Sequence, residues 1–317
     1  MPSTWKDFVD FYNLVKGKTN RELLVEQKEI SRPTLSLRFK PFFDLTIPPL
    51  IVWRLLPPKL SSFPNLPWIY GVDGKWLHRA GVIMNHRDIT NRENLWWSYH
   101  ISESYEAYDL DLDELSKKLI NNLPSGVVSD WKGGGVMGII RHFGLIPHQR
   151  CLAHVLRTLK SLLPKNSSIP EIRKLRFIAK EIIHLKDEID VWNWQSDLID
   201  WEKQYSKSLI IKTIGVNTKK KWWYTHGDLR RAWRLLIKDQ NHFFVHIDNK
   251  LIPPTNNSLE GVNSQMKQKL GDHRGMKLPQ QVSFAFWYYT FSRVKNPSDL
   301  KKLWVGWKKS YNSKNQH

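Results

Sequence analysis

The sequence predicts an α/β fold, because strand-like and helix-like patterns alternate along a single chain of 317 residues. Hydrophobic residues follow the period of strands between residues 68 and 101. The short apolar strand Gly126 to Ser129 is then followed by a helix and by a second extended segment that ends at Arg150. A unit of strand, helix and strand is typical of a sheet that is flanked by helices.

Composition and hydrophobic period divide the chain into five segments. Residues 1–45 read as short helices joined by tight turns, with a capping-box spacing at Thr19 and Glu22, which indicates a helix-turn-helix DNA-binding region. Residues 46–66 form a proline-rich connector in which continuous helix or central strand is disfavoured. A predicted core of strands and helices occupies residues 67–164 and 246–317, the latter with a basic tail, and an amphipathic helical insertion occupies residues 165–245.

The charge of the chain indicates a polyanionic partner. Lysine and arginine number 49 against 30 acidic residues, which gives a net charge of +19. The longest apolar stretch, Ile47 to Trp53, is interrupted by Pro48 and Pro49, so no segment is expected to span a membrane. The charged N-terminus does not fit a secretory signal, and a cytoplasmic location is expected. The single cysteine, Cys151, excludes an intrachain disulfide.

Three acidic residues lie where predicted strands or helices begin or end, which is where oxygen ligands for divalent ions are found. They are Asp73, Asp130 and Glu260. Each has a simpler explanation, because Asp73-Gly74 is a strong hairpin-turn signal, Asp130 could cap the following helix, and Glu260 could be a favourable charge in a first helical turn. No one of the three is persuasive alone.

The glycines after Asp130 allow a different interpretation. Gly133, Gly135 and Gly138 have the G-x-G-x-x-G spacing of a dinucleotide fold. The acidic residue that such a fold carries further on is missing, because nothing acidic occurs between Asp130 and Glu171. An NADP site is therefore disfavoured, and the glycines more simply allow close approach of a phosphate backbone or a metal.

Cys151 and His154 are three residues apart at the start of a predicted helix, close to His148. Half of a zinc site has this spacing. The favoured explanation is a buried thiol and a hydrogen-bonded histidine that anchor the helix to the sheet.

Basic and aromatic residues interleave twice within the predicted insertion, at Lys219-Lys-Lys-Trp-Trp-Tyr and at Arg230-Arg-Ala-Trp-Arg, which is typical of nucleic-acid binding. A solvated basic helix and a generic helical hairpin are the alternatives. The candidate DNA-binding residues are Lys219, Lys220 and Lys221 beside Trp222 and Trp223, then Arg32 and Thr34 for base edges, and Arg38 and Lys40 for phosphates.

Four ordered segments together resemble a DDE transposase of the bacterial Mutator-like group. They are Tyr70-Gly-Val-Asp73-Gly, Val128-Ser-Asp130-Trp-Lys-Gly, Gln149-Arg-Cys151-Leu-Ala-His154 and Thr255-Asn-Asn-Ser-Leu-Glu260-Gly.

The resemblance implies an RNase H-like fold with a mixed sheet, a helical insertion between the second and third acids, and a helix-turn-helix before the core. It implies that Asp73, Asp130 and Glu260 bind two Mg²⁺ ions, with Mn²⁺ able to substitute. Cys151 and His154 match the family's C-x-x-H signature, whose role is structural or close to DNA. Two basic residues beyond the third acid would clamp phosphates, namely Lys267 and Arg274.

The implied partners are the terminal repeats of an insertion sequence and its target DNA, bound by a homo-oligomer at the nucleoid of a prokaryote. The implied reaction is metal-dependent strand cleavage and strand transfer. A non-catalytic DNA-binding protein derived from a transposase is the alternative, and an NADP-linked oxidoreductase is a weaker one. This chain lacks the cysteine-paired zinc element that related enzymes often carry before the helix-turn-helix.

Overall fold

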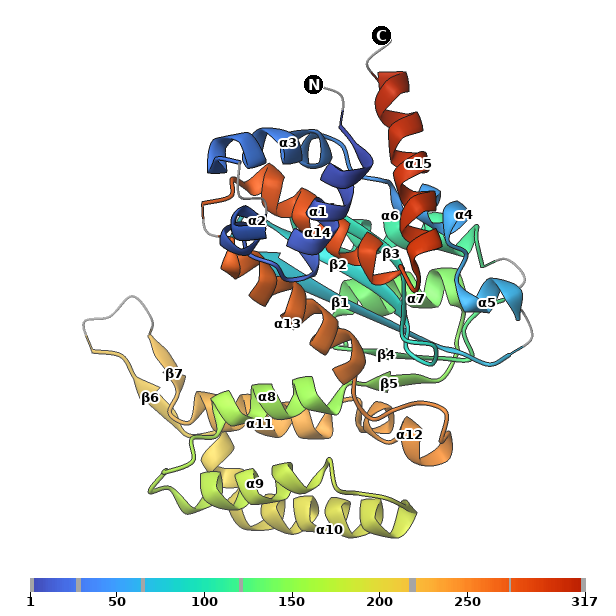
Figure 1. The fold of residues 1–317 in the computed structure, drawn as a ribbon. Helices are drawn as coiled ribbons and strands as arrows, with labels where there is room; N and C mark the ends of the chain where they lie inside the picture. Colours follow the sequence, from blue (N-terminus) through green and yellow to red (C-terminus); the bar gives the residue numbers. More distant parts are fainter. Residues whose placement is uncertain are drawn as a thin grey trace. The chain divides into compact units, whose positions relative to one another are not determined.

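The computed structural model describes residues 3–26, 30–63, 66–119, 122–216, 221–273 and 275–314. The main sheet has five strands in the order β3-β2-β1-β4-β5, and two further strands form a separate hairpin. A mixed sheet flanked by helices confirms the predicted α/β class and agrees with an RNase H-like fold (Figure 1). Among these residues, none of the helices combines the length and apolar character that a bilayer crossing requires.

The chain forms two compact units. Unit 1 comprises Met1–Ser125, Lys132–Ile146 and Asn257–His317, and unit 2 comprises Gly126–Trp131 and Pro147–Asn256. The elements of unit 1 are α1 (Trp5–Lys16), α2 (Asn20–Glu26), α3 (Arg32–Asp44), α4 (Pro49–Leu55), α5 (Lys59–Ser62), β1 (Ile69–Leu77), β2 (Gly81–Asp88), β3 (Glu93–His100), α6 (Tyr105–Ser116), α7 (Gly133–Phe143), α13 (Asn257–Asp272), α14 (Leu278–Ser292) and α15 (Pro297–Lys314).

Strand β1 runs without interruption through Asp73 and Gly74, so the interpretation of this pair as a hairpin turn is wrong. In the antiparallel pairing of β1 with β2, Asp73 lies opposite Asn85. The chain turns only after β1 ends, where His78 adopts a φ of 54°. Gly74 serves close packing instead, since a Cβ at this position would lie 2.9 Å from Cγ2 of Val82.

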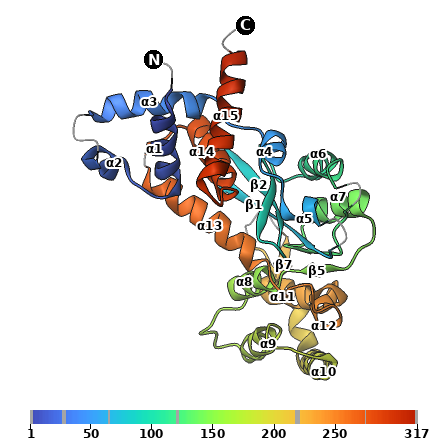
Figure 2. The ribbon, with the colours of Figure 1, turned by 45° about the vertical axis from the view of Figure 1, so that its right-hand side comes forward.

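Helices cover both faces of the β1–β3 meander in unit 1. Figures 1 and 2 show α13 and α14 on one face and α6 and α7 on the other. The glycines of α7 allow it to approach α6 closely, because a Cβ on Gly134 would lie 2.8 Å from the backbone nitrogen of Tyr105, and one on Gly135 would lie 2.9 Å from the Tyr108 ring. Helix packing therefore accounts for Gly135 and Gly138 of the dinucleotide-like spacing, whereas a Cβ on Gly133 would have no neighbour within 4 Å among the described residues.

Aromatic side chains from both ends of the chain share one core in unit 1. Phe11 of α1 stacks on Phe42 of α3, with ring centroids 5.0 Å apart, and Phe42 meets Trp307 of α15 at 4.6 Å. The indole of Trp287 in α14 donates a hydrogen bond to the Phe42 carbonyl (2.7 Å). The N-terminal helices are thus packed against the C-terminal helices.

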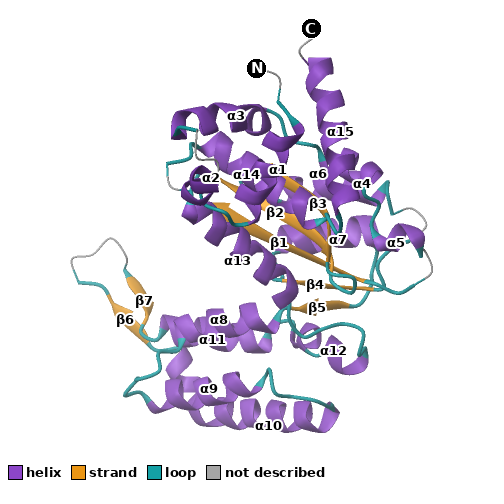
Figure 3. Cartoon of the chain, viewed as in Figure 1, coloured by secondary structure: helices purple, strands orange, loops and turns teal. Residues whose placement is uncertain are grey.

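Unit 2 is mainly helical, as Figure 3 shows. A short parallel pair of strands, which aligns Val127 with His148, begins it. Helix α8 contacts α9 and α11, and α9 contacts α10. The elements are β4 (Gly126–Ser129), β5 (His148–Arg150), α8 (Leu152–Leu162), α9 (Pro170–Glu181), α10 (Glu188–Tyr205), β6 (Lys212–Ile214), β7 (Trp222–Tyr224), α11 (Gly227–Ile237) and α12 (Val245–Asp248), with short 3₁₀ turns at Ser206–Leu209 and Gln240–Phe243.

An antiparallel hairpin of β6 and β7 interrupts the segment 165–245, which the sequence predicts to be helical. Both strands consist largely of β-branched and aromatic residues, which favour strands over helices. The ammonium of Lys212 lies 4.1 Å from the ring centroid of Trp222, so the two strands are also joined by a cation–π contact.

Candidate active site

Asp73 is held rigidly in the middle of β1. The residue is only 9% exposed, and the ladder with β2 fixes its backbone. Its carboxylate Oδ2 accepts a hydrogen bond of 2.8 Å from the side-chain amide of Asn263. A neutral amide orients a carboxylate without neutralising it, so this contact leaves the negative charge of Asp73 in place.

The same amide places the helix of Glu260 against the strand of Asp73. Glu260 and Asn263 are three residues apart on α13, so their side chains lie on one face of that helix, one turn apart. Helix α13 packs against β1, with Asn263 fully buried and Glu260 half-buried. Two of the three predicted acids are thus carried by neighbouring elements of unit 1.

Asn263 is the centre of a buried polar network that supports this arrangement. Its carbonyl Oδ1 accepts hydrogen bonds from the Tyr289 hydroxyl (2.7 Å) and from the Asn85 amide (3.2 Å). Burial and the charge of Asp73 raise the pKa of Tyr289, which keeps its hydroxyl protonated as a donor. A buried network whose members satisfy one another restricts side-chain motion, so the orientation of Asp73 is predetermined.

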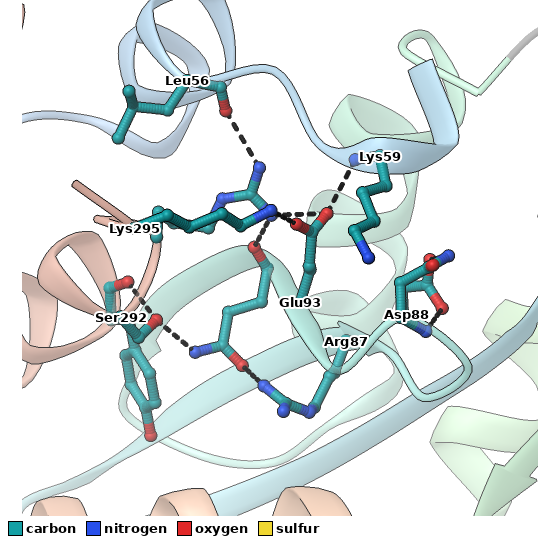
Figure 4. Close-up of polar contacts among 11 residues, drawn as sticks. Leu56, Lys59, Arg87, Asp88, Glu93, Ser292 and Lys295 are labelled. Carbon is teal, nitrogen blue, oxygen red and sulfur yellow. Dashed lines mark hydrogen bonds and ion pairs between the residues drawn. The ribbon is translucent and has the colours of Figure 1, made fainter. Parts of the chain in front are cut away.

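The network extends away from Asp73 through Asn94. The guanidinium of Arg87 donates to Oδ1 of Asn94 (2.6 Å), and the Asn94 amide donates to the Ser292 hydroxyl (2.8 Å). Figure 4 labels Arg87 and Ser292, the two ends of this series of contacts. Burial lowers the pKa of Arg87 to about 10, so this guanidinium remains charged at neutral pH. The three side chains join β2, β3 and α14.

Asp130 lies in unit 2, directly after β4, in a turn with a distinctive backbone. The next residue, Trp131, has a φ of 68°, in the left-handed region that bulky residues rarely adopt. The Ser129 hydroxyl stabilises this turn, since it accepts a hydrogen bond from the Trp131 amide (3.2 Å) and is bonded to Nε2 of His148 (2.7 Å). Asp130 is half-buried and is not the N-cap of α7, which is Lys132.

The buried His148 predicts a loss of stability in mild acid. Burial and the neighbouring His242 lower the pKa of His148 to about 3. Between this value and the ordinary pKa of about 6.5, the unfolded chain binds a proton that the folded chain does not. The stabilisation from neutral His148 is fully present above about pH 6.5 and declines as the pH falls. The loss of unfolding free energy reaches about 2 kcal/mol at pH 5. Urea unfolding of the whole chain at pH 7 and pH 5 measures this loss.

A His148→Gln variant provides the control for that measurement. Burial also lowers the pKa values of His246 and His273, so part of the pH dependence is expected to remain. The variant should reduce the slope of unfolding free energy against pH by the equivalent of about one bound proton. An unchanged slope would contradict the assignment to His148.

Cys151 anchors the chain segment that leads out of unit 2. The thiol is fully buried, and its Sγ accepts a hydrogen bond from the Asn256 backbone amide (3.2 Å). The neighbouring Leu152 amide donates to the Pro254 carbonyl (3.0 Å). These contacts support the expectation of an anchoring cysteine at the start of α8, and His154 follows one turn later on the same helix.

The structure places the candidate DNA-binding residues on several elements. Arg32 and Thr34 are exposed in the first turn of α3, where Ser31 caps the helix. Arg38 forms an ion pair with Asp7, and Lys40 forms one with Asp44. Exposed positions are also taken by Lys221, before β7, and by Lys267 on α13, whereas Lys219, Lys220 and Arg274 lie outside the described residues.

The proposed acids form a donor set that suits a hard divalent cation. All three offer carboxylate oxygens, the ligand type that Mg²⁺ prefers. Asp73 is buried and oriented, and Glu260 lies in the first turn of α13, where the helix dipole stabilises a negative charge. The residues present therefore fit divalent metal ions.

Comparison with known families gives one match. The model of the Transposase IS66 family matches residues 141–262, rather more than a third of the chain. The matched part includes Cys151, His154 and Glu260, together with the helices between them, and a search of curated proteins finds no match. IS66 is a different group from the Mutator-like one, so the match supports a DDE transposase but not that group.

A DDE transposase depends on divalent metal and binds DNA as its substrate. The match accordingly adds an activity to the observed fold. The chain is similar to IS66 transposases over residues 141–262, and it functions as an insertion-sequence transposase, an enzyme of the DDE type.

Proposed function

We propose that Asp73, Asp130 and Glu260 together hold two Mg²⁺ ions, for which Mn²⁺ can substitute, and that this site cuts and joins DNA at the ends of an insertion sequence. The observation that carries the proposal is the hydrogen bond from Asn263 to Asp73, which sets the helix of Glu260 against the strand of Asp73. Bound divalent ions supply charge neutralisation at the scissile phosphate and a polarised nucleophile.

The protein's own residues provide position and charge. Asn263 acts as a positioning residue, because it donates to the Asp73 carboxylate while its own carbonyl is held by the buried Tyr289 hydroxyl. The turn of Trp131 presents Asp130 in one backbone conformation. Asp73, Asp130 and Glu260 would hold the ions with about three negative charges, so the occupied site would keep a positive balance suited to a phosphodiester.

The remaining assignments complete this proposal. Residues 1–45 would bind the terminal repeats, with Arg32 and Thr34 facing base edges and Arg38 and Lys40 facing phosphates. Lys219, Lys220, Lys221, Lys267 and Arg274 would contact DNA phosphates, and a homo-oligomer would hold paired ends at the nucleoid in the cytoplasm. The matched family is IS66. The resemblance to the Mutator-like group would therefore reflect the order of the three acids along the chain, which DDE enzymes have in common.

Metal removal tests the proposed function. Labelled duplexes that carry the ends of the element encoding this chain are incubated with the full-length protein and Mg²⁺. Nicked and joined products are expected with Mg²⁺ or Mn²⁺, and none is expected with excess EDTA. Duplexes of the same length without the element ends serve as the control. Absence of products with either metal would exclude the proposed chemistry.

A further inference from the structure

Unit 2 contains a basic groove beside the turn that carries Asp130. The groove has a volume of about 370 Å³, within the range of small-ligand sites. It lies among the ends of β4 and β5 and one face of α11, and Asp239 is the only acidic residue among the described residues that line it. The cationic lining residues are Arg150, Arg231, Arg234 and Lys238.

Two of these cations lie on α11, and a third follows it directly. Arg231 and Arg234 are three residues apart, so their side chains lie on the same helix face, and Lys238 is the C-cap residue after Ile237 and also lines the groove. Arg231 is paired with Asp228 at 2.5 Å, whereas Arg234 and Lys238 are exposed and make no side-chain ion pair within the described part of the chain. Two adjacent cations are therefore available to an anion.

Arg150 contributes a fourth cation from the end of β5. Its guanidinium lies 5.4 Å from the ring centroid of Phe243. Among the described residues, its buried Nε has no hydrogen-bond partner. Burial lowers the pKa of Arg150, and the charges of Asp239 and Asp130 oppose that effect. A buried donor without a partner is costly unless a ligand completes it.

Trp131 forms another wall of the groove in an unusual conformation. Its ring lies against His242, with centroids 4.0 Å apart, and against His148 at 4.6 Å. The His242 ring nitrogen in turn bonds the His148 carbonyl (3.1 Å). The left-handed φ of 68° at Trp131 is unfavourable for a bulky residue, and such residues gather at functional sites.

We propose that this groove binds the sugar-phosphate backbone of a DNA strand, with consecutive phosphates on Arg234 and Lys238, a third contact at Arg150, and a sugar or base against Trp131. The inference rests on the proposed function, because it supplies the strand that the Asp130 site cuts. Convergence of cations from two elements on one concave surface distinguishes the groove from a solvated helix face, which would present its charges to open solvent.

Salt-dependent DNA binding tests the groove without any cleavage. Fluorescence anisotropy measures the affinity of the full-length chain for a labelled 40-base-pair duplex of arbitrary sequence, in EDTA, between about 50 and 300 mM KCl. Each lost phosphate contact lowers the slope of log affinity against log salt by about 0.9. The Arg234→Gln/Lys238→Gln double variant is expected to lower this slope by about 2. The charge-preserving Arg234→Lys/Lys238→Arg variant should keep it.

The matched control is Lys180→Gln/Lys203→Gln, which removes the same charge from exposed positions of α9 and α10 in the same unit. It should leave the slope within the error of the wild type. A groove variant that behaves like this control would overturn the proposal. Titration of inorganic pyrophosphate forms a second arm, and loss of pyrophosphate binding with an unchanged DNA slope would also overturn it, because the groove would then serve a small phosphate compound.

The two proposals fail separately in these assays. Binding in EDTA to an arbitrary sequence requires neither the metal site nor the element ends. A normal groove effect without any cleavage by the wild type in Mg²⁺ would reject the metal site alone. If the wild type cleaves DNA while the groove variant has an unchanged salt slope of DNA affinity, the groove proposal alone is rejected.

Discussion

Asp130→Asn is expected to lower Mg²⁺-dependent cleavage of end DNA by about 100- to 1,000-fold, the loss typical of removing one group that stabilises developing charge. The substitution keeps the size of the side chain and removes the charge that the metal ions require. The Ser129 hydroxyl should still bond the Trp131 amide and His148 in this variant, which supports the shape of the turn. Single-turnover cleavage rates measure the effect.

Asp200→Asn is the control for this experiment, since it removes an exposed carboxylate from α10 of the same unit. It should retain the wild-type rate, and both variants should bind DNA in EDTA. If Asp130→Asn cleaved as fast as Asp200→Asn, Asp130 would have no place in the metal site.

Arg293→Met is expected to lower the free energy of unfolding by about 3 to 5 kcal/mol, because it removes the buried cation that pairs with a buried carboxylate and leaves Glu93 with one exposed cation. The side chains of Arg293 and Glu93 are 5% and 6% exposed and form an ion pair of 3.1 Å. The guanidinium also donates to the Leu56 carbonyl (2.9 Å). Figure 4 shows Glu93 together with its two further partners, the Lys59 backbone amide and the Lys295 ammonium.

Lys295→Met provides the comparison for Arg293→Met in urea unfolding. Its side chain is 55% exposed, so its ion pair with Glu93 should contribute no more than about 1 kcal/mol. A second comparison, Arg293→Met/Glu93→Leu, removes both buried charges and should recover part of the loss. Equal costs for Arg293→Met and Lys295→Met would show that burial of this pair is unimportant.

Local sequence is enough to predict an element where the residues indicate one kind of secondary structure and tertiary pairing does not override it. The strand Gly126–Ser129 was predicted with the bounds that the structure has, because a short apolar run is followed directly by an acid and glycines. At Asp73-Gly74, in contrast, the turn signal is overridden by pairing with β2. The nine-residue strand β1 gains more from a continuous ladder than a local turn would provide.

The support of the candidate site could not be predicted in the same way. Asn263 lies only two residues beyond the quoted segment that ends at Gly261, yet its bonds to Asp73, Asn85 and Tyr289 join positions from three distant parts of the sequence. No local pattern indicates which polar residues will meet inside a core. The acids themselves were identified from their order and from the resemblance, whereas their orienting partners required coordinates.

The aromatic core shared by α1, α3, α14 and α15 has a consequence during synthesis. A ribosome releases Phe11 and Phe42 long before it reaches Trp287 and Trp307, so the first helices lack their packing partners until translation is almost finished. A copy of the gene with a late premature stop codon would therefore leave the hydrophobic face of α1 and α3 exposed to chaperones and proteases. Damage near the end of the reading frame should thus eliminate the product from the cell rather than yield a shortened competitor.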